Sequence, residues 1–203
     1  LVAEGREGIR GLTLSNAMHL SSWLNRMVEN LLSVTRIDSG QVSVQKSPTV
    51  LEELVDAVLV KFRKHYPGQP VEAQIPEAFI IIPMDSILIE QVIINLLENA
   101  VFHAAGMTRL VLRVSARGSR AVFEVSDDGC GIPAERLESL FSGAGERDAP
   151  PADSSRHSMG IGLSVCATII RAHGGELRAE SAVNRGTTFR FALEMEEDAH
   201  EQQ

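Results

Sequence analysis

Cysteine and aromatic residues are scarce in this sequence of 203 residues. It contains two cysteines, Cys130 and Cys166, and aromatic residues make up 4% of the chain. The two cysteines do not have a metal-binding spacing, and such sparse use suits the reducing conditions of the cytoplasm. With only one tryptophan and one tyrosine, we expect a core of leucine, isoleucine and valine.

An excess of positive charge is also missing. The formal net charge is −8 at pH 7, with 27 acidic residues against 19 lysines and arginines. A nucleic-acid surface needs clustered basic side chains for the phosphates, so the composition argues against nucleic acid as a partner. The remaining composition, 44% hydrophobic and 23% charged, is that of a globular domain with a sizeable core.

Long apolar runs are missing too. The longest uninterrupted stretches, such as residues 79–82, are far shorter than the roughly 20 residues that span a bilayer. The residues after Leu1 do not form a basic region followed by an apolar one, so a signal peptide is not indicated. Because Leu1 is not a natural start, we expect a piece of a larger protein.

Residues 12–38 show the periodicity of a long helix, with apolar residues in steps of three and four, and Gly40 ends it. The narrow apolar seam is typical of a helix that pairs with another helix. Packing onto the chain's own domain fits the periodicity equally well.

Downstream of this helix, the pattern alternates between helical and strand periodicities. The predicted elements are a strand at 41–45, a helix at 50–65, strands near 71–75 and 79–82, a helix at 86–104 with Ser86 as its N-cap, a hairpin at 108–127 that turns at Gly118-Ser119, a loop at 142–159, a helix at 161–173 and a second hairpin at 176–195. Hairpins separate most of the helices. The order therefore favours an α+β fold, with a mixed or antiparallel sheet and helices on one face.

Two asparagines stand four residues apart on the predicted helix at 86–104. Asn95 and Asn99 share one face of this strongly apolar helix, where buried carboxamides cost free energy unless each finds a partner. Amide oxygens are hard neutral ligands that suit Mg²⁺ held mainly by phosphates and water. The alternative is a helix edge where both side chains meet solvent or cap a loop.

A glycine-rich turn follows the first hairpin, with Asp127 at the end of a strand and the sequence Asp127-Asp128-Gly129-Cys130-Gly131-Ile132-Pro133. A carboxylate in this place can accept a hydrogen bond from an exocyclic amine such as that of adenine. Gly129 and Gly131 permit backbone conformations and a close ligand approach that side chains would block. An ordinary acidic turn before a short helix explains the same residues.

A second glycine pair, Gly160 and Gly162, stands at the start of the helix predicted at 161–173. A glycine-rich entry, here Gly160-Ile161-Gly162-Leu163, would present free backbone N–H groups and the positive helix end to phosphate. The motif lacks the lysine of a Walker loop and the third glycine of a dinucleotide fingerprint. Gly186-Thr187 begins the last predicted strand, where a plain hairpin start is the stronger interpretation.

Taken in order, these motifs resemble the ATP-binding domain of bacterial sensor histidine kinases. The asparagine helix, the Asp-x-Gly-x-Gly turn, Phe141, the Gly-x-Gly segment and the Gly-Thr strand start match that family's N, G1, F, G2 and G3 boxes. The resemblance covers roughly residues 45–195. Residues 31–40 also resemble the end of the second helix of the family's dimerisation hairpin, and the whole chain is similar to the kinases of potassium and osmotic sensing.

The resemblance implies a Bergerat-type, two-layer α/β sandwich preceded by one long dimerisation helix. The implied domains are part of a helical hairpin at 1–40, the ATP-binding catalytic domain at 41–197 and a tail at 198–203. ATP and Mg²⁺ are the implied ligands, with Asp127 on the adenine amine and Asn99, with Asn95, on the metal. The full set of implied ATP contacts is Asn95, Asn99, His103, Asp127, Gly129, Gly131, Ile132, Gly160, Gly162, Leu163 and Thr187.

Some residues depart from the family pattern. Phe102 and His103 stand where these kinases commonly carry Lys-Tyr, so Phe102 removes a cation from the phosphates, while His103 can still stack on adenine. Positive charge in the lid would then come from Arg147 or Arg156. Related chaperone and mismatch-repair ATPases have a glutamate that activates water at the position of Asn95. The asparagine side chain cannot accept a proton at neutral pH.

The family's phosphate-accepting histidine is followed by acidic and Arg-Thr-Pro-like residues, and none of the six histidines has this setting. His19, for example, is followed by Leu20-Ser21-Ser22. We therefore expect a fragment that does not autophosphorylate on its own. Glu98, next to Asn99, is predicted to be a surface carboxylate and not a general base.

The resulting hypothesis is a histidine kinase fragment that transfers the γ-phosphoryl group of ATP to a histidine on another segment. The implied partners are the protein's own phosphoacceptor helix, a response regulator and a second copy bound through residues 12–38. The implied location is cytoplasmic, with a membrane reached only through segments outside this sequence. A nucleotide-sensing module that has lost catalysis is the alternative, and an ATP hydrolase is disfavoured by Asn95.

Overall fold

The computed structural model describes residues 44–137, 140 and 154–196 of the chain. The helix predicted at 12–38, most of the loop at 142–159 and the tail at 198–203 lie outside these residues. The predicted domain boundaries and the predicted homodimer through residues 12–38 therefore remain predictions.

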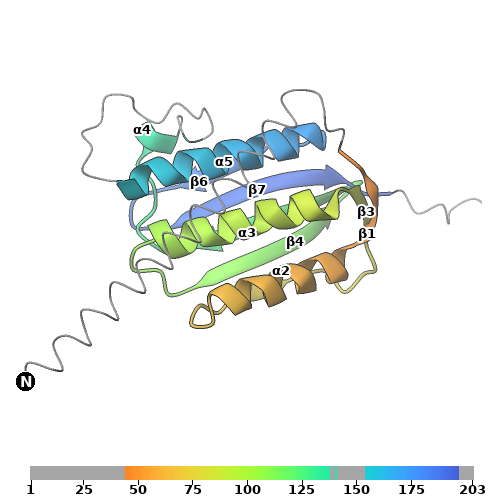
Figure 1. Cartoon of the computed structure of the whole chain (residues 1–203), viewed down its shortest axis with the longest axis horizontal. Helices are drawn as coiled ribbons and strands as arrows, with labels where there is room; N and C mark the ends of the chain where they lie inside the picture. Colours follow the sequence, from red (N-terminus) through yellow and green to blue (C-terminus); the bar gives the residue numbers. More distant parts are fainter. Residues whose placement is uncertain (1–43, 138–139, 141–153, 197–203) are drawn as a thin grey trace, which may run out of the picture.

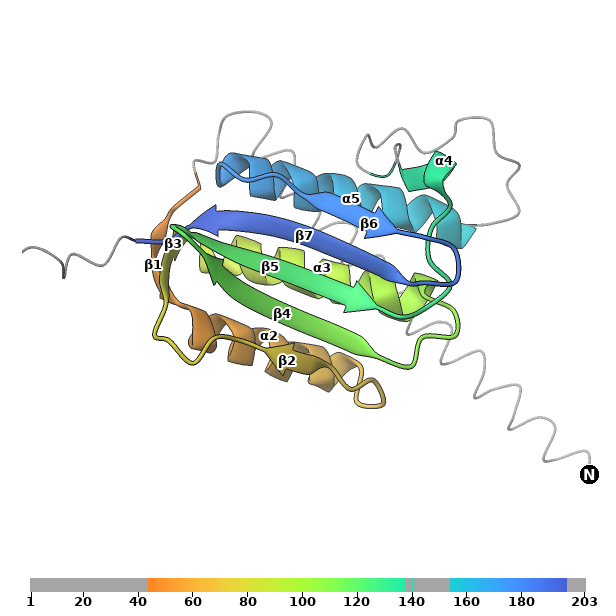
Figure 2. The same ribbon diagram turned by 180° about the vertical axis from the view of Figure 1, so that it is seen from behind.

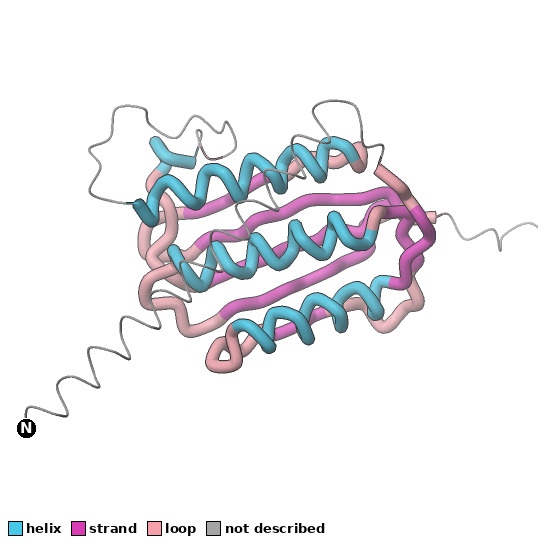
Figure 3. Tube along the Cα trace, in the orientation of Figure 1, coloured by secondary structure: helices cyan, strands magenta, loops and turns pink. Residues whose placement is uncertain are grey.

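The described chain forms two layers, a sheet and a set of helices packed on one of its faces (Figures 1 and 3). The elements are β1 (Ser47–Val50), α2 (Leu51–His65), β2 (Glu72–Gln74), β3 (Ile81–Met84), α3 (Ser86–His103), β4 (Leu110–Arg117), β5 (Arg120–Asp127), α4 (Ala134–Leu137), α5 (Ser154–Ala172), β6 (Arg178–Ser181) and β7 (Thr187–Glu194). The five-stranded sheet has the order β2-β4-β5-β7-β6. In it, β2 is parallel to β4 and the other neighbours are antiparallel. The predicted two-layer sandwich with a mixed sheet is confirmed.

The core lies between the sheet and the helices α2, α3 and α5, and it consists mainly of leucine, isoleucine and valine. Phe123 and Val125 of β5 belong to this core, and the intervening Val122 and Glu124 are also buried, so β5 is a central strand covered on both faces. Phe123 is the cross-strand partner of Phe191 on β7, and their rings stack with centroids 4.8 Å apart. These two rings therefore lie in the centre of the sheet.

α3 lies between α2 and α5 (Figure 1), so it is apolar around most of its circumference. Its N-cap is Asp85, whose Oδ1 accepts a hydrogen bond from the Leu88 backbone N–H at 3.3 Å. The prediction of Ser86 as the cap was wrong by one residue, because Asp85 has the extended backbone and the acceptor that a cap needs. In the part of the chain that the structure describes, none of the helices is both long and apolar enough to cross a membrane.

Of the strand predicted at 41–45, residues 41–43 lie outside the described residues and 44–45 are not in a strand. The first described strand, β1, begins at Ser47. The residues before it bind to the ends of two helices. The Gln45 backbone N–H donates to Asp85 Oδ2 at 3.4 Å, and Lys46 Nζ donates to the His173 carbonyl at 2.8 Å. The His173 ring is buried at the same place, where its Nε2 accepts from the Asp85 backbone N–H at 3.1 Å. Pairing with β3 starts after these contacts.

α5 begins at Ser154, seven residues before the predicted start at 161. Its apolar periodicity becomes visible only near Leu163, because residues 154–158 are polar. Gly160 and Gly162 therefore lie inside the helix, whereas the prediction placed them at its start. Each glycine lowers the helix stability by about 1 kcal/mol relative to alanine. Burial of Leu163, Ile169 and other residues on the core side stabilises the helix despite this cost.

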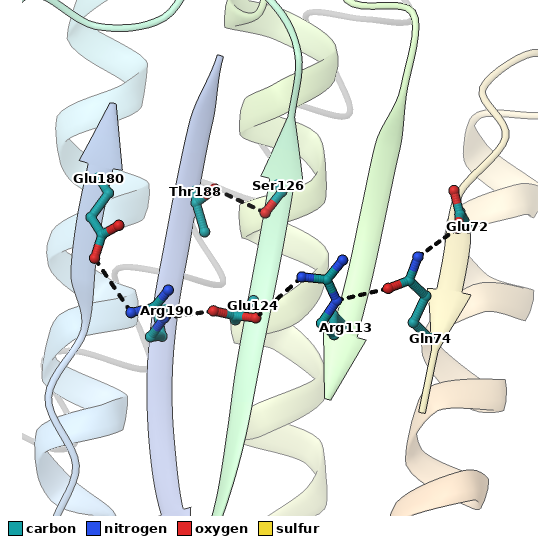
Figure 4. A network of polar contacts seen from close by, with 8 residues as sticks. All are labelled: Glu72, Gln74, Arg113, Glu124, Ser126, Glu180, Thr188 and Arg190. Atoms are coloured by element: carbon teal, nitrogen blue, oxygen red, sulfur yellow. Dashed lines mark hydrogen bonds and ion pairs between the residues drawn. The ribbon is translucent and has the colours of Figure 1, made fainter. Parts of the chain in front are cut away.

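The sheet face opposite the helices carries a chain of polar contacts (Figures 2 and 4). At its centre Glu124 of β5 accepts from Arg190 Nε of β7 at 2.7 Å and lies 3.8 Å from Nη1 of Arg113 on β4. Gln74 and Glu180 extend the chain to β2 and β6. The Glu124 side chain is only 8% exposed, so the two arginines compensate a nearly buried charge.

Candidate functional site

A pocket of about 230 Å³ opens at the end of the sandwich where α3 ends and β7 begins. α4 lies at the same end of the molecule (Figure 1). The pocket is lined by Asn99, Ala100, Phe102, His103, Ala104, Asp127, Cys130, Gly131, Ile132, Pro133, Arg136, Thr187 and Phe189. Folding therefore brings together residues that sequence reasoning placed in three separate motifs. The predicted site residues among them are Asn99, His103, Asp127, Gly131, Ile132 and Thr187.

Asp127 is the last residue of β5 and pairs with Thr187, the first residue of β7. Its Oδ1 accepts a hydrogen bond from the Gly129 backbone N–H at 2.9 Å. Burial raises the pKa of the Asp127 carboxyl, although hydrogen bonds from the Gly129 and Thr187 backbones act in the opposite direction. A partly desolvated acceptor at the pocket wall binds an amine donor more strongly than an exposed one. The geometry fits the predicted contact with an adenine amine.

The neighbouring carboxylate, Asp128, has a structural role. Its Oδ1 accepts from the backbone N–H groups of Thr108 and Arg109 at 2.7 and 2.8 Å, and its Oδ2 accepts from Thr108 Oγ1 at 2.5 Å. These hydrogen bonds, that from the Thr108 side chain first, lower the pKa of Asp128 to about 2. Asp128 fixes the chain before β4, which leaves Asp127 as the acid of the pocket.

The glycines around Asp127 allow backbone segments to approach each other. Gly131 has φ +68°, and a Cβ there would meet the Ala182 carbonyl oxygen at 2.0 Å. Gly186 has φ +77°, and a Cβ there would meet the Asp127 carbonyl oxygen at 1.9 Å. Ser181 joins the two segments, because its Oγ accepts from the Ile132 N–H at 2.8 Å and donates to the Gly186 carbonyl at 2.7 Å. The glycine spacing thus serves close packing of the protein on itself at the site.

The third glycine of this region, Gly129, does not line the pocket. A Cβ at Gly129 would lie 2.6 Å from the Ala104 side chain, at the end of α3. Its role in the structure is to let the turn after Asp127 close onto that helix. A direct contact between Gly129 and ATP remains a prediction.

Asn99 and Asn95 have different surroundings although they share a helix face. Asn99 lines the pocket, and its Nδ2 is buried without a hydrogen-bond partner among the described residues. Asn95 is 8% exposed and hydrogen-bonds Cys166 of α5 with its side chain, outside the set of pocket-lining residues. Burial raises the pKa of the Cys166 thiol to about 12, so it stays protonated. The unsatisfied N–H donor of Asn99 in the pocket wall fits an acceptor such as a phosphate oxygen. Because Asn99 and not Asn95 is among the described residues that line the pocket, its Oδ1 is the stronger candidate for Mg²⁺.

Glu98 is buried, and the prediction that it is a surface carboxylate was wrong. Its Oε1 accepts a hydrogen bond from the Tyr66 hydroxyl at 3.0 Å, which joins α3 to the chain just after α2. The Tyr66 ring also meets the ring of Phe102 edge-on, with centroids 6.0 Å apart. Sequence periodicity missed this role because the partner is 32 residues away.

His103, Phe102 and Arg136 also line the pocket. Burial, and secondarily the charge of Arg136, lowers the pKa of His103 and favours its neutral form. Phe102 is 48% exposed at the pocket. Arg136 of α4 was missed by the sequence reasoning, which looked for positive charge at Arg147 or Arg156. The available signal was its position three residues after Pro133, at the end of the glycine turn.

Leu163 and Gly162 are not among the described residues that line the pocket. Leu163 is fully buried in the core, and Gly160 and Gly162 lie within α5. Their contacts with ATP remain predictions. No group of three or more His, Cys, Asp or Glu that could hold a metal occurs within residues 44–137, 140 and 154–196. Any Mg²⁺ held here would depend on amide oxygens and on the phosphates.

The sequence matches the family model for histidine kinase-, DNA gyrase B- and HSP90-like ATPases over residues 84–197. The chain belongs to this family. Together with the two-layer fold, this makes the described part an ATP-binding catalytic domain of the sensor histidine kinase type.

Individual sensor kinases are similar to this chain over most of its length. Sensor protein KdpD of Clostridium acetobutylicum is 34% identical over 176 residues, which are 87% of this chain and 19% of KdpD. The adaptive-response sensory kinase SasA of Microcystis aeruginosa is 32% identical over 173 residues, which are 84% of this chain and 44% of SasA. The solved catalytic domain of histidine kinase ThkA, in a nucleotide-free form, is 25% identical with a TM-score of 0.59 and covers 73% of this chain and 95% of its own. The chain thus spans less than half of either curated relative.

Proposed function

We propose that this chain is the catalytic part of a two-component sensor histidine kinase, which binds ATP with Mg²⁺ and donates the γ-phosphoryl group to a histidine on another segment. The observation that carries the proposal is the meeting of Asp127 and Asn99 in one pocket. Asp127 offers an acceptor for the adenine amine, and Asn99 offers an unsatisfied carboxamide for the phosphate side.

The residues of this chain act by binding and orientation. Asp127 and Thr187 hold the adenine end, while Asn99 holds Mg²⁺, which neutralises phosphate charge when it is bound. The acceptor imidazole nitrogen forms a bond to the γ-phosphorus as the bond to the bridging oxygen breaks. ADP leaves with that electron pair, and the imidazole proton is released to solvent. The phosphoryl group then passes to a response regulator.

The residues of α3 favour transfer of the phosphoryl group to histidine over hydrolysis of ATP. Water activation needs a base near the γ-phosphate, and Asn95 is a carboxamide that hydrogen-bonds Cys166. Glu98 is the carboxylate closest in sequence to Asn95 and Asn99. It accepts a hydrogen bond from the Tyr66 hydroxyl and is not among the pocket-lining residues. We therefore expect slow ATP hydrolysis by the isolated chain.

Calorimetric titration with a non-hydrolysable ATP analogue and Mg²⁺ tests the binding step. We expect binding of ATP and little binding of GTP, because a carboxylate acceptor favours the adenine amine. Asp127→Asn should weaken ATP binding roughly 10- to 100-fold, the range for losing a hydrogen bond to a charged group. Equal affinity of the wild-type chain for ATP and GTP would contradict the role of Asp127. An absence of binding at millimolar nucleotide would refute the proposal as a whole.

A separate fragment that carries the phosphoacceptor histidine tests the transfer step. The kinase should label this fragment from ATP labelled at the γ-phosphate, and should not label itself. A protein that binds ATP but leaves the acceptor unlabelled would be a nucleotide-sensing module. The absence of a cation at Phe102 favours this alternative.

We further propose that the signalling system responds to potassium or osmotic conditions, which the resemblance to KdpD supports. SasA is similar at nearly the same identity, so the regulator must be tested directly. The labelled acceptor should pass its phosphoryl group fastest to the response regulator of a potassium system. Faster transfer to an unrelated regulator would contradict this assignment.

A further inference from the structure

The pocket contains little positive charge for a ligand that is strongly anionic. Its ionisable lining residues in the described part of the chain are Asp127, His103, Arg136 and Cys130. Arg136 is the one lysine or arginine among them. In the last turn of α3, the pocket is lined by the uncharged Phe102. A triphosphate needs cationic groups besides Mg²⁺, and a guanidinium matches phosphate oxygens with two parallel N–H donors.

Arg136 stands on an anchored turn. α4 starts right after the glycine turn, and the backbone N–H groups of Arg136 and Leu137 both donate to the Pro133 carbonyl, at 3.0 and 3.2 Å. The preceding Ile132 is fixed by its N–H bond to Ser181 Oγ at 2.8 Å, and Leu137 packs against the core. The backbone is therefore held at the pocket, and the Arg136 side chain, which lines it, is exposed.

We propose that Arg136 binds the phosphates of the nucleotide and supplies the positive charge that the end of α3 does not provide. This assignment rests on the proposed function, because it presupposes that ATP occupies the pocket. Arg136 would then select nucleoside di- and triphosphates over nucleosides, whereas Asp127 would select adenine over other bases. The short α4 then becomes part of the binding site.

The pKa of His103 also reports on the charge of Arg136. The positive charge of Arg136 contributes to the lowered pKa of His103, after the larger effect of burial. Neutralising Arg136 by substitution, or by a bound phosphate, should therefore raise the pKa of His103. Histidine proton resonances followed from pH 5 to 8 would report this shift in the full 203-residue chain.

The experiment compares Arg136→Gln with Arg117→Gln in the full chain, using calorimetric titrations with ATP, ADP and adenosine in the presence of Mg²⁺. Arg117 is a matched control, because it lies at the far end of β4, where it pairs with Arg120, whereas Asp127 pairs with Leu110 at the pocket end. Arg136→Gln should weaken ATP binding about tenfold, or about 1.4 kcal/mol, and leave adenosine binding unchanged. Arg136→Lys should restore part of the ATP affinity, and Arg117→Gln should match the wild type.

The outcomes separate the inference from the function on which it rests. Unchanged ATP affinity in Arg136→Gln, while the wild type binds ATP, would overturn the role of Arg136 and leave the proposed function intact. An equal loss for adenosine and ATP would show that Arg136 stacks on the base and would also overturn the phosphate assignment. If the wild type binds no ATP, both fail together. Melting curves of the variants establish that each is folded before titration.

Discussion

Gly186 is the residue whose replacement should disturb the candidate site most directly. In Gly186→Ala the new Cβ would stand 1.9 Å from the Asp127 carbonyl oxygen and 2.8 Å from the Asp128 Cα, so the two segments must move apart. The backbone φ of +77° adds a second cost, because a side chain disfavours this region by about 1–2 kcal/mol. Overpacking of a close-packed site costs about 1–3 kcal/mol more. The sum is a destabilisation of about 2–5 kcal/mol.

Gly118→Ala is the matched control for this variant. Gly118 also sits in a hairpin turn and has φ +60°, but a Cβ there would have no atom within 4 Å outside its chain neighbours. It therefore carries the backbone cost of about 1–2 kcal/mol without the steric one. The difference between the two variants isolates the contact with Asp127.

Thermal unfolding followed by circular dichroism measures this difference. At about 2–4 °C per kcal/mol for a chain of this size, Gly186→Ala should lower the Tm by roughly 4–20 °C and Gly118→Ala by roughly 2–8 °C. Gly186→Ala should also weaken ATP binding well below its Tm, because the Asp127 backbone is displaced. Equal Tm values for the two variants would show that the turn relaxes without cost and would refute the steric reasoning.

Charged groups lead to three further predictions. Because the folded-state pKa of Asp127 is raised, its charge reduces stability as the pH rises above 3.8, so Asp127→Asn should melt at or above the wild-type Tm at pH 7; a marked loss of Tm would contradict this. Because burial lowers the pKa of His173, its contribution to stability should be lost as the pH falls below 6.5, and His173→Gln should flatten the Tm between pH 7.5 and 5.5; an unchanged slope would oppose this role. Glu124→Gln should lower the Tm by about 2–4 °C, since a nearly buried ion pair is lost, whereas Glu194→Gln, whose pair is exposed, should not; equal effects would exclude burial as the cause.

The sequence predicts those elements whose periodicity is strong and local. The hairpin of β4 and β5 and the helix α3 appear nearly as predicted, because alternation and helical spacing run through their full lengths. The positions of β1 and the start of α5 were not predicted. β1 depends on pairing with β3, more than 30 residues away, and the first turns of α5 are polar, so neither boundary has a local signal.

The candidate site shows the same division. Asp127 was predictable because a carboxylate at a strand end beside two glycines is a local pattern. Arg136 was not, since it stands on a four-residue helix and reaches the pocket only because the glycine turn docks on β6 and the turn after it. The contact of Asn95 with Cys166 likewise depends on the packing of α3 against α5.

One turn of α3 connects the packing of the helical layer to the pocket. Asn95 bonds α5 through Cys166, Glu98 bonds Tyr66 after α2, and Asn99 enters the pocket wall. Asn95 itself is a carboxamide that cannot take a proton from water at neutral pH. This turn of α3 therefore places an amide at the pocket and no general base at position 95, which agrees with the proposed transfer to an imidazole better than with hydrolysis.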